Sequence, residues 1–143
     1  MIRPARAEDA DALTRLELDA FDSDGWSPGQ VEAELAGLTR HVFVAESDGD
    51  VIGYAAIAVA GDVADLTRIV VAASQRRVGV AAALLAALHD AAAQAGAERM
   101  LLEVADSNVD ARAFYAAQGY TEVSRRRGYY ASGDDALVLG RAL

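Results

Sequence analysis

A glutamate interrupts the apolar stretch RMLLEV at residues 99–104. Glutamate is a poor strand former, so a carboxylate at this place in a buried strand calls for an explanation. Alternation along the strand places Glu103 on the same face as Leu101, and Met100 and Leu102 on the opposite face. The functional interpretation is a general base that takes a proton from a substrate. The structural alternative is a strand-end glutamate that reaches solvent or pairs with an arginine, and this strand alone favours that alternative.

Two further polar residues follow in the stretch ADSNVDARAFYAAQGY, residues 105–120. Tyr115 is either an aromatic on the core face of a helix, the usual outcome for such a residue, or a phenol that protonates a leaving group. Asn108 either does no more than cap that helix, together with Ser107, or hydrogen-bonds a ligand. The stretch by itself leaves both pairs of alternatives open.

The loop SQRRVGV, residues 74–80, precedes a long helix and has the residue types of an anion site. The first N–H groups of a helix have no partners within the helix, and the helix dipole favours an anion there. Gly79 lets the backbone approach a ligand closely, and Arg76 and Arg77 supply positive charge. The pattern is neither a GxxxxGK[ST] nucleotide loop nor a GxGxxG dinucleotide loop. A single glycine before a helix is equally consistent with a structural role.

Composition limits the possible classes of function. The chain has 143 residues, 53% of them hydrophobic, which is enough for one domain, residues 1–143, with a sizeable core. It has no cysteine, which excludes disulfides, thiolate metal sites and a cysteine nucleophile. Neither His41 nor His89 has a partner at metal-ligand spacing, so both are expected to be structural or exposed and no metal site is expected.

Charge and hydropathy further limit the partners. The net charge is −9, and all 13 basic residues are arginine. The negative net charge argues against nucleic-acid binding and favours a cationic partner such as a basic peptide. No stretch has the roughly 20 apolar residues of a membrane span, and the N-terminus lacks the apolar core of a signal peptide. We therefore expect a cytoplasmic protein that binds no membrane.

Periodicity and capping signals predict the elements that position these residues. Strands are expected at residues 1–5, 41–46, 51–59, 62–71, 99–104, 120–126 and 136–142. Helices are expected over residues 8–20, from the SPGQ capping box at 27–30, from the arginine loop to Gly96, and from SNVD at 107–110 to Gly119. The Asp48-Gly49 pair predicts a hairpin. The order β-α-α-β-β-β-α-β-α-β-β indicates a mixed α/β sheet.

Arg76, Gly79 and Ala81 match Arg/Gln-x-x-Gly-x-Gly/Ala, the acetyl-CoA motif of the GNAT superfamily of N-acetyltransferases, which the chain resembles here. The resemblance implies the GNAT fold, with a splayed central strand pair. It implies that amides of this loop hold the CoA pyrophosphate and that the end of the preceding strand pairs with the pantetheine arm. The cofactor-binding residues expected on this basis are Ile69, Val70, Val71, Arg76, Arg77, Val78, Gly79, Val80, Ala81 and Ala82. Ala82 stands where many relatives have a basic residue, so Arg77 is a candidate replacement contact.

The stretch LEVADSNVDARAFYAAQGY resembles the RimI type of GNAT enzyme, the ribosomal-protein-alanine N-acetyltransferases, which carry LEV-x-x-SN, then a tyrosine, then Gly-Phe. The resemblance implies that Glu103 is the catalytic base, Tyr115 the acid, and Asn108 a cofactor contact. Tyr120 replaces the usual phenylalanine.

Two other segments resemble the same type. AFDSDGWSPGQ is similar to Ala-Phe-Pro-Trp-Ser, with three more residues between Phe21 and Trp26, and RRRGYYASGDDALVL is similar to Arg-Arg-x-Tyr-Tyr before an acidic-to-apolar last strand. In such enzymes these segments flank the peptide groove, which makes Trp26, Tyr129 and Tyr130 candidate substrate contacts. The structural alternatives are a helix-start aromatic and two surface-loop tyrosines.

The resemblance implies acetyl transfer from acetyl-CoA, as cosubstrate, to the α-amine of a protein N-terminus by direct attack in a ternary complex. The implied acceptor is a small-subunit ribosomal protein with N-terminal alanine. We expect a monomer or weak dimer. Two alternatives stay open: a GNAT enzyme acting on lysines or a small-molecule amine, and a non-catalytic acetyl-CoA-binding regulatory module.

Overall fold

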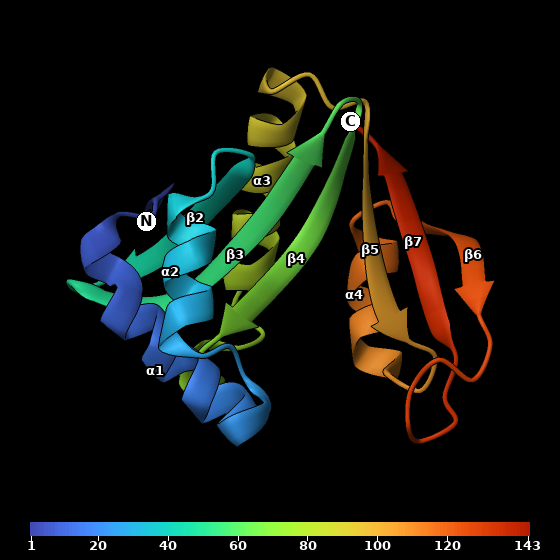
Figure 1. Ribbon diagram of the computed structural model, residues 1–143, viewed down its shortest axis with the longest axis horizontal. Coiled ribbons are helices and arrows are strands. Elements are labelled where there is room, and N and C mark those ends of the chain that lie inside the picture. Colours follow the sequence, from blue (N-terminus) through green and yellow to red (C-terminus); the bar gives the residue numbers. More distant parts are fainter.

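A seven-stranded sheet runs through the computed structural model, which describes residues 1–143 (Figure 1). The strands are β1 (Ile2–Pro4), β2 (Arg40–Ser47), β3 (Asp50–Ala60), β4 (Val63–Val71), β5 (Arg99–Ala105), β6 (Thr121–Arg126) and β7 (Ala136–Ala142). The helices are α1 (Ala10–Phe21), α2 (Pro28–Ala36), α3 (Val80–Gln94) and α4 (Val109–Ala117), with 3-10 turns η1 (Ala7–Asp9), η2 (Asp22–Asp24) and η3 (Ala73–Gln75). The predicted order of helices and strands is confirmed, and no helix combines the length and apolarity needed to cross a membrane.

Local signals place the ends of several elements where the sequence predicts them. The Ser27 hydroxyl accepts a hydrogen bond from the Gln30 backbone, and the Gln30 side chain accepts one from the Ser27 backbone, which completes the capping box of α2. Asp48 and Gly49 both have positive φ, 52° and 84°, as a two-residue hairpin turn between β2 and β3 requires. These signals are local because each involves backbone groups at most three residues apart.

The central strand pair is splayed, as predicted. The strand order is β1-β2-β3-β4-β5-β7-β6, and every neighbouring pair is antiparallel except β4 and β5. The parallel β4–β5 ladder covers only residues 63–65 and 99–101, after which the two strands diverge (Figure 1). The later part of β4 therefore pairs with β3 alone, and the gap widens toward the end where the α1–α2 and β6–β7 connections lie.

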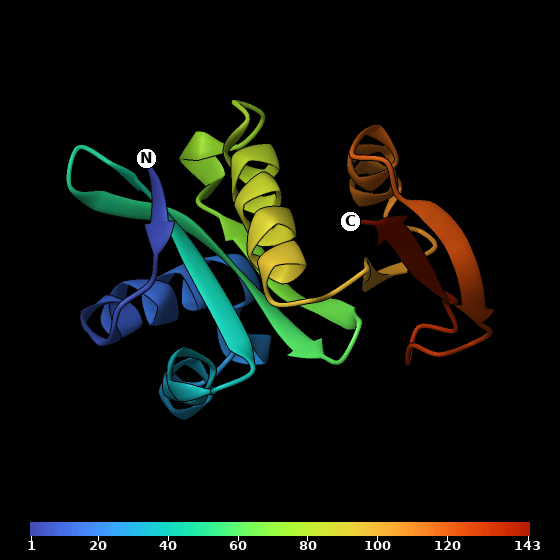
Figure 2. The ribbon, with the colours of Figure 1, turned by 90° about the horizontal axis from the view of Figure 1, so that it is seen from above.

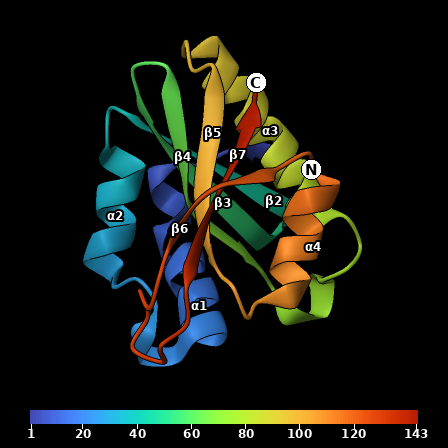
Figure 3. The same cartoon turned by 90° about the vertical axis from the view of Figure 1, so that its right-hand side faces the viewer.

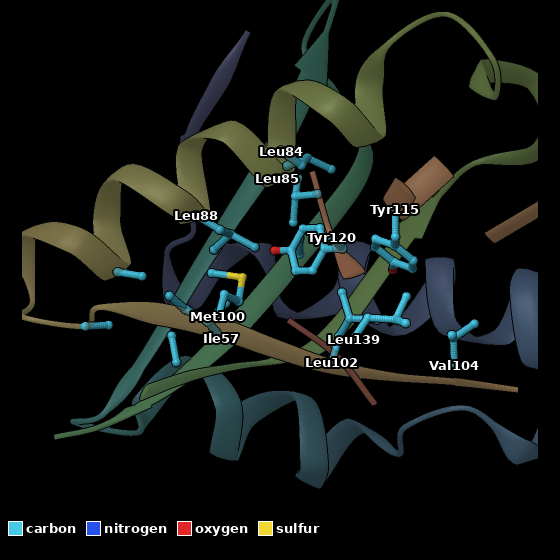
Figure 4. Packing of buried hydrophobic residues seen from close by; sticks show 14 of the residues in the cluster. Ile57, Leu84, Leu85, Leu88, Met100, Leu102, Val104, Tyr115, Tyr120 and Leu139 are labelled. Atoms are coloured by element: carbon cyan, nitrogen blue, oxygen red, sulfur yellow. The ribbon is translucent and has the colours of Figure 1, made fainter. Parts of the chain in front are cut away.

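Helices cover the sheet on both faces. Helices α1 and α2 lie on one face, and α3 and α4 on the other (Figures 2 and 3). The larger core cluster lies under α3 and α4 and includes Leu84, Leu85 and Leu88 of α3, which point toward Ile57 and Met100 of the sheet (Figure 4). A smaller cluster holds α1 and α2 through Leu13, Leu16, Val31, Val44, Tyr54 and Val70. The face of β5, β7 and β6 opposite α4 carries no helix (Figure 2).

His89 of α3 ties the helix to the C-terminal part of the sheet. Its Nε2 lies 2.8 Å from the hydroxyl of Tyr120, and its Nδ1 is hydrogen-bonded to the guanidinium of Arg141 on β7. An arginine N–H can only donate, so Nδ1 accepts, and the neutral ring donates through Nε2–H. Burial and the Arg141 cation lower the pKa of His89 to about 4.

We expect this histidine to weaken the fold in acid. Because the unfolded chain takes up the proton near pH 6.5 and the folded protein only near pH 4, the free energy of unfolding must fall as pH drops through this window. Because His89 is partly exposed, solvent reduces the effect of its pKa shift, and we expect the free energy of unfolding to fall by about 1–2 kcal/mol. Urea melts at pH 7 and pH 4 should show a smaller loss for His89→Gln than for the wild type, while His41→Gln on β2 serves as control. Equal losses for all three proteins would contradict the prediction.

Candidate active site

A first cleft lies where the chain passes from β4 into α3. It has a volume of about 550 Å³. Its lining residues are Ile69, Val71, Gln75, Arg76, Arg77, Gly79, Val80, Ala81, Ala82, Ala111, Phe114, Tyr115 and Gln118. Gly79 is the N-cap of α3, with φ +89°, and no side chain caps the helix. The first N–H groups of α3 are therefore left without a capping partner at the edge of this cleft.

The arginines of the loop adopt two different conformations. Arg76 donates from Nε to the Val71 carbonyl at 3.1 Å and so holds the loop against the end of β4. Arg77 has φ +64°, a left-handed conformation that is rare for a residue with a side chain. Its guanidinium is mostly exposed, 3.7 Å from the Asp110 carboxylate on α4. Positive φ at both Arg77 and Gly79 gives the tightly turned backbone typical of anion-binding loops.

Most residues predicted to bind the cofactor line this cleft, and three do not. The side chain of Val70 is buried in the smaller core cluster on the opposite face of β4, which leaves only its backbone for a ligand. Val78 is 69% exposed and outside the lining, and Asn108 lies in a second cleft. The cleft is also lined by four residues that the sequence did not predict, Gln75, Ala111, Phe114 and Gln118. Ala111 and Phe114 lie on α4 and Gln118 directly follows it, and only the folding of α4 against the gap brings them to the loop.

The second cleft occupies the gap between β4 and β5 and joins the first. It has a volume of about 570 Å³. Its lining residues are Phe21, Leu66, Thr67, Arg68, Ile69, Leu102, Glu103, Val104, Ala105, Asn108, Ala111, Tyr115 and Tyr130. Ile69, Ala111 and Tyr115 line both clefts, so Tyr115 stands at their junction. The structure thus brings Glu103, Asn108, Tyr115 and Tyr130 into one space.

Glu103 lies on the predicted face of β5. Met100, Leu102 and Val104 are buried in the core beneath α3 and α4, whereas the Glu103 side chain is 35% exposed toward the gap. Its Oε1 lies 3.4 Å from the guanidinium of Arg126 on β6. The carboxylate is therefore both accessible from the cleft and paired with an arginine, so features of both interpretations occur together.

Tyr115 packs in the core and reaches the clefts at the same time. The residue is 7% exposed, and its ring meets the rings of Phe114 and Tyr120 edge-on at centroid distances of 5.1 and 5.7 Å. Figure 4 shows it beside Leu102, Val104 and Leu139. Burial raises the pKa of Tyr115 to about 12, so the phenol carries its proton throughout the neutral range.

Asn108 caps α4, because its side-chain oxygen accepts a hydrogen bond from the Ala111 N–H at 3.2 Å. Ser107, its neighbour, instead bonds the carboxylate of Asp134. Asp135 accepts from the Gly128 N–H and from Arg125, which lower the pKa of its carboxyl. The two aspartates, which lie in the β6–β7 connection, thus both have structural partners.

The three aromatic residues predicted to contact substrate occupy different surroundings. Tyr130 lines the second cleft, with its ring edge-on to Tyr129 at 5.2 Å, and Tyr129 is 52% exposed beside Arg126. Trp26 lies outside the lining of both clefts and packs 6.4 Å from Tyr54. Their roles as substrate contacts stay predictions.

The second cleft is also lined, on the α1 side of the gap, by Phe21 and Arg68. Phe21 was predicted only as part of a segment that flanks the groove, and Arg68 was not predicted. A signal for this region was available: Glu17 follows Leu13 by four residues, so it belongs to the buried stripe of α1 and needs a partner. The partner is Arg68, 51 residues away. No local pattern identifies it.

The arrangement combines three chemical capabilities. The first cleft offers backbone N–H groups and arginines to an anionic ligand. The splayed end of β4 offers backbone groups without a strand partner on the β5 side. The second cleft offers a carboxylate that can accept a proton and a phenol that can donate one, which is the acid–base pair that acyl transfer to an amine requires.

Comparisons with known proteins agree with this chemistry. The family model described as "Acetyltransferase (GNAT) family" matches residues 10–120. "N-alpha-acetyltransferase RimI" of Mycobacterium tuberculosis is 34% identical, over 93% of this chain and 86% of that protein. "N-alpha-acetyltransferase" of Sulfurisphaera tokodaii is 32% identical, over 99% of this chain and 92% of that protein. The crystal structure of the ribosomal-protein-S18-alanine N-acetyltransferase from Escherichia coli superposes with a TM-score of 0.88 at 29% identity, covering 99% of this chain and 92% of that one.

Proposed function

Because the chain belongs to the GNAT family of acetyltransferases and is an acetyl-CoA-dependent N-acetyltransferase, we propose that it acetylates the α-amine of a protein N-terminus. The observation that carries the proposal is the second cleft, where a carboxylate and a protonated phenol share one space beside the loop of the acetyl-CoA motif. The names of the N-alpha-acetyltransferase relatives support the α-amine. For the acceptor we propose a small-subunit ribosomal protein with N-terminal alanine, as in the name of the similar Escherichia coli enzyme.

The first cleft fits coenzyme A. A Cβ built on Gly79 meets no atom within 4 Å, so the backbone there is open to a bound group. The amides at the start of α3, with Arg76 and Arg77 nearby, suit a pyrophosphate. Ile69 and Val71 at the splayed end of β4 provide the wall for a pantetheine arm, which leads toward Tyr115. Bound there, acetyl-CoA supplies the activated acetyl group as a thioester.

Gly79→Ala is expected to weaken CoA binding about tenfold, because a side chain at φ +89° is strained by about 1–2 kcal/mol and the loop shifts to relieve it. Gly96→Ala at the other end of α3 is the matched control, with φ +96° and equally open space around a Cβ. Both variants should lose similar stability in urea melts, but only Gly79→Ala should show a higher CoA Kd by calorimetry. Equal CoA affinities in the two variants would refute the role of the loop.

Glu103 serves as the base in this proposal. An N-terminal ammonium must lose a proton before its nitrogen can attack, since only the free amine has a lone pair. The Glu103 carboxylate takes up that proton, directly or through a water, from an amine held in the second cleft. Arg126 keeps the carboxylate oriented toward the gap.

Tyr115 serves as the acid. As the C–N bond forms and the C–S bond breaks, the sulfur leaves with the bonding electron pair, and the phenol gives it a proton. The phenol is suited to this role because burial keeps it protonated at neutral pH. As the C–N bond forms the attacking nitrogen becomes positively charged, and it gives up its second proton to solvent to become the amide. The phenolate regains a proton from solvent, and Glu103 releases the proton that it took up, before the next turnover. With no cysteine in the chain, direct attack within a ternary complex is the proposed route.

A peptide panel tests the function. Lysine-free peptides with different N-terminal residues are incubated with enzyme and acetyl-CoA, and mass spectrometry locates the acetyl group. We expect it on the α-amine, with N-terminal alanine preferred, and not on N-terminally blocked peptides that contain lysine. Turnover only of lysine side chains, a polyamine or an aminoglycoside would overturn the proposal. The chain itself contains no lysine, so self-acetylation of lysine cannot obscure the result.

A further inference from the structure

A buried carboxylate on α1 organises the side of the gap opposite to Glu103. Glu17 is fully buried. Its carboxylate accepts hydrogen bonds from the Tyr54 hydroxyl, from the Trp26 backbone N–H at 2.8 Å, and from two nitrogens of Arg68, one of which lies 2.9 Å from Oε2. Burial opposes ionisation, but these bonds outweigh it and hold the pKa of Glu17 below its usual value. A buried charge with so many partners marks a fixed arrangement.

Arg68 extends this arrangement to two aromatic rings. Its guanidinium carbon lies 4.2 Å from the centroid of the Phe21 ring and 4.9 Å from that of Trp26. Phe21 is the last residue of α1, and Trp26 immediately precedes the Ser27 cap of α2. Arg68 therefore holds both ends of the connection between the two helices.

The same connection packs closely on Glu17. A Cβ on Gly25 would lie 2.8 Å from the backbone oxygen of Glu17, so only glycine allows this approach. The Trp26 N–H bond to the carboxylate fixes the following residue. Residues 21–26 are thus held to Glu17 and Arg68 by ring contacts, a hydrogen bond and close backbone packing.

Arg68 and Phe21 also line the second cleft, together with Glu103, Tyr115 and Tyr130. We propose that Arg68 is a positioning residue for the acceptor: held by Glu17, it fixes Phe21 and Trp26 and thereby the wall of the cleft against which the acceptor lies. The proposal rests on the proposed function, because it takes the second cleft as the acceptor site. Arg68 acts through these rings and is not assigned contact with the reacting atoms.

Charge pairing explains why this arginine is compatible with a cationic acceptor. An unpaired guanidinium in the cleft would repel an approaching ammonium. The Glu17 carboxylate offsets the charge of Arg68, so the Glu17–Arg68 pair can hold the two rings without adding net charge to the cleft. The planar guanidinium can engage the carboxylate with its edge while contacting rings with its faces, which the single ammonium of lysine cannot do.

Arg68→Lys is therefore expected to raise the peptide KM about tenfold, the scale of a lost cation–ring contact. The acetyl-CoA KM should stay within about twofold, because no residue of the arginine loop changes. Trp26 is the only tryptophan, so acrylamide quenching of its fluorescence reports on the connection without reference to activity, and quenching should increase.

Two further variants keep the test decisive. Arg3→Lys is the matched control: Arg3 likewise donates two bonds to a carboxylate, Asp9, at 2.9 Å and another to Glu46, but it lies on β1, outside both clefts. The double variant Glu17→Gln with Arg68→Met removes both charges and so leaves no unpaired buried ion if the single variant misfolds. It should show the same rise in peptide KM and in quenching.

The outcomes separate the two proposals. A rise in peptide KM and quenching for both Arg68 variants, absent in Arg3→Lys, supports the positioning role. Unchanged quenching, or an equal change in Arg3→Lys, overturns it. If the wild type acetylates no peptide, the proposed function fails, whereas Trp26 quenching and the KM of whichever amine is accepted still test whether Arg68 positions the wall.

Discussion

Glu103→Gln is expected to lower kcat for an N-terminal peptide by about 10²–10⁴-fold at pH 7, the usual contribution of a general base. Glutamine keeps the size and hydrogen-bonding capacity of the side chain but cannot accept a proton from an ammonium. The CoA Kd should be unchanged, because Glu103 lies outside the first cleft. Steady-state kinetics and calorimetry on the same preparation measure the two quantities.

The pH dependence gives this prediction a second readout. An α-amine has a pKa of about 7.7–8.0, so at pH 9.5 most of the acceptor is already deprotonated and the base is needed less. The deficit of Glu103→Gln should therefore shrink between pH 7 and pH 9.5. Glu122→Gln on β6 is the control, since it also removes an exposed, arginine-paired carboxylate but one outside both clefts. A wild-type rate for Glu103→Gln at pH 7 would exclude Glu103 as the base.

Tyr115→Phe is expected to reduce kcat about 10²-fold or more, because the thiolate then has to leave without a proton donor. The core packing of the ring is retained, so the stability and the CoA Kd should change little. Since the pKa of Tyr115 is raised to about 12, the phenol is protonated at all pH values usable in an assay, and the loss should be the same from pH 6 to pH 9.

Tyr120→Phe is the matched control for this substitution. Tyr120 is also a buried tyrosine, its ring lies 5.7 Å from that of Tyr115, and its hydroxyl bonds His89 outside both clefts. Removing this hydroxyl should lower stability by about 1 kcal/mol and leave kcat unchanged. Equal rates for Tyr115→Phe and the wild type would show that Tyr115 is a core aromatic only.

The helices and strands were predictable because their signals are local. The Ser27–Gln30 capping box, the Asp48-Gly49 turn and the alternation of residues 99–104 all act within a few residues, and each is present in the structure as predicted. The N-cap of α4 differs slightly from the expectation that Ser107 and Asn108 cap the helix together. Asn108 alone caps it, whereas Ser107 is hydrogen-bonded to Asp134. Both residues have side chains that can cap a helix, but Asp134 of the β6–β7 connection accepts a hydrogen bond from Ser107, which leaves the cap to Asn108.

The site was predictable in part, through its motif residues. Arg76, Gly79 and Ala81 line one cleft, and Glu103 and Tyr115 line the next, but the sequence contains no information on how the two clefts join. Phe21 belongs to the AFDSDGWSPGQ segment but was not itself predicted to contact the substrate, and Arg68 carries no motif. Their place in the site follows from the pairing of Glu17 with Arg68, which forms only when α1 packs on β4.

The order of the elements, the face of β5 that Glu103 occupies and the loop that opens α3 all follow from local sequence patterns, because backbone geometry repeats over two to four residues. The shape of the gap, in contrast, depends on how the strands and helices pack together. The β4–β5 ladder ends after three residue pairs, and this divergence places Tyr115 between two clefts and brings Arg68 into the lining of the second. Contacts across 51 residues depend on the packing of whole elements, which no local pattern encodes.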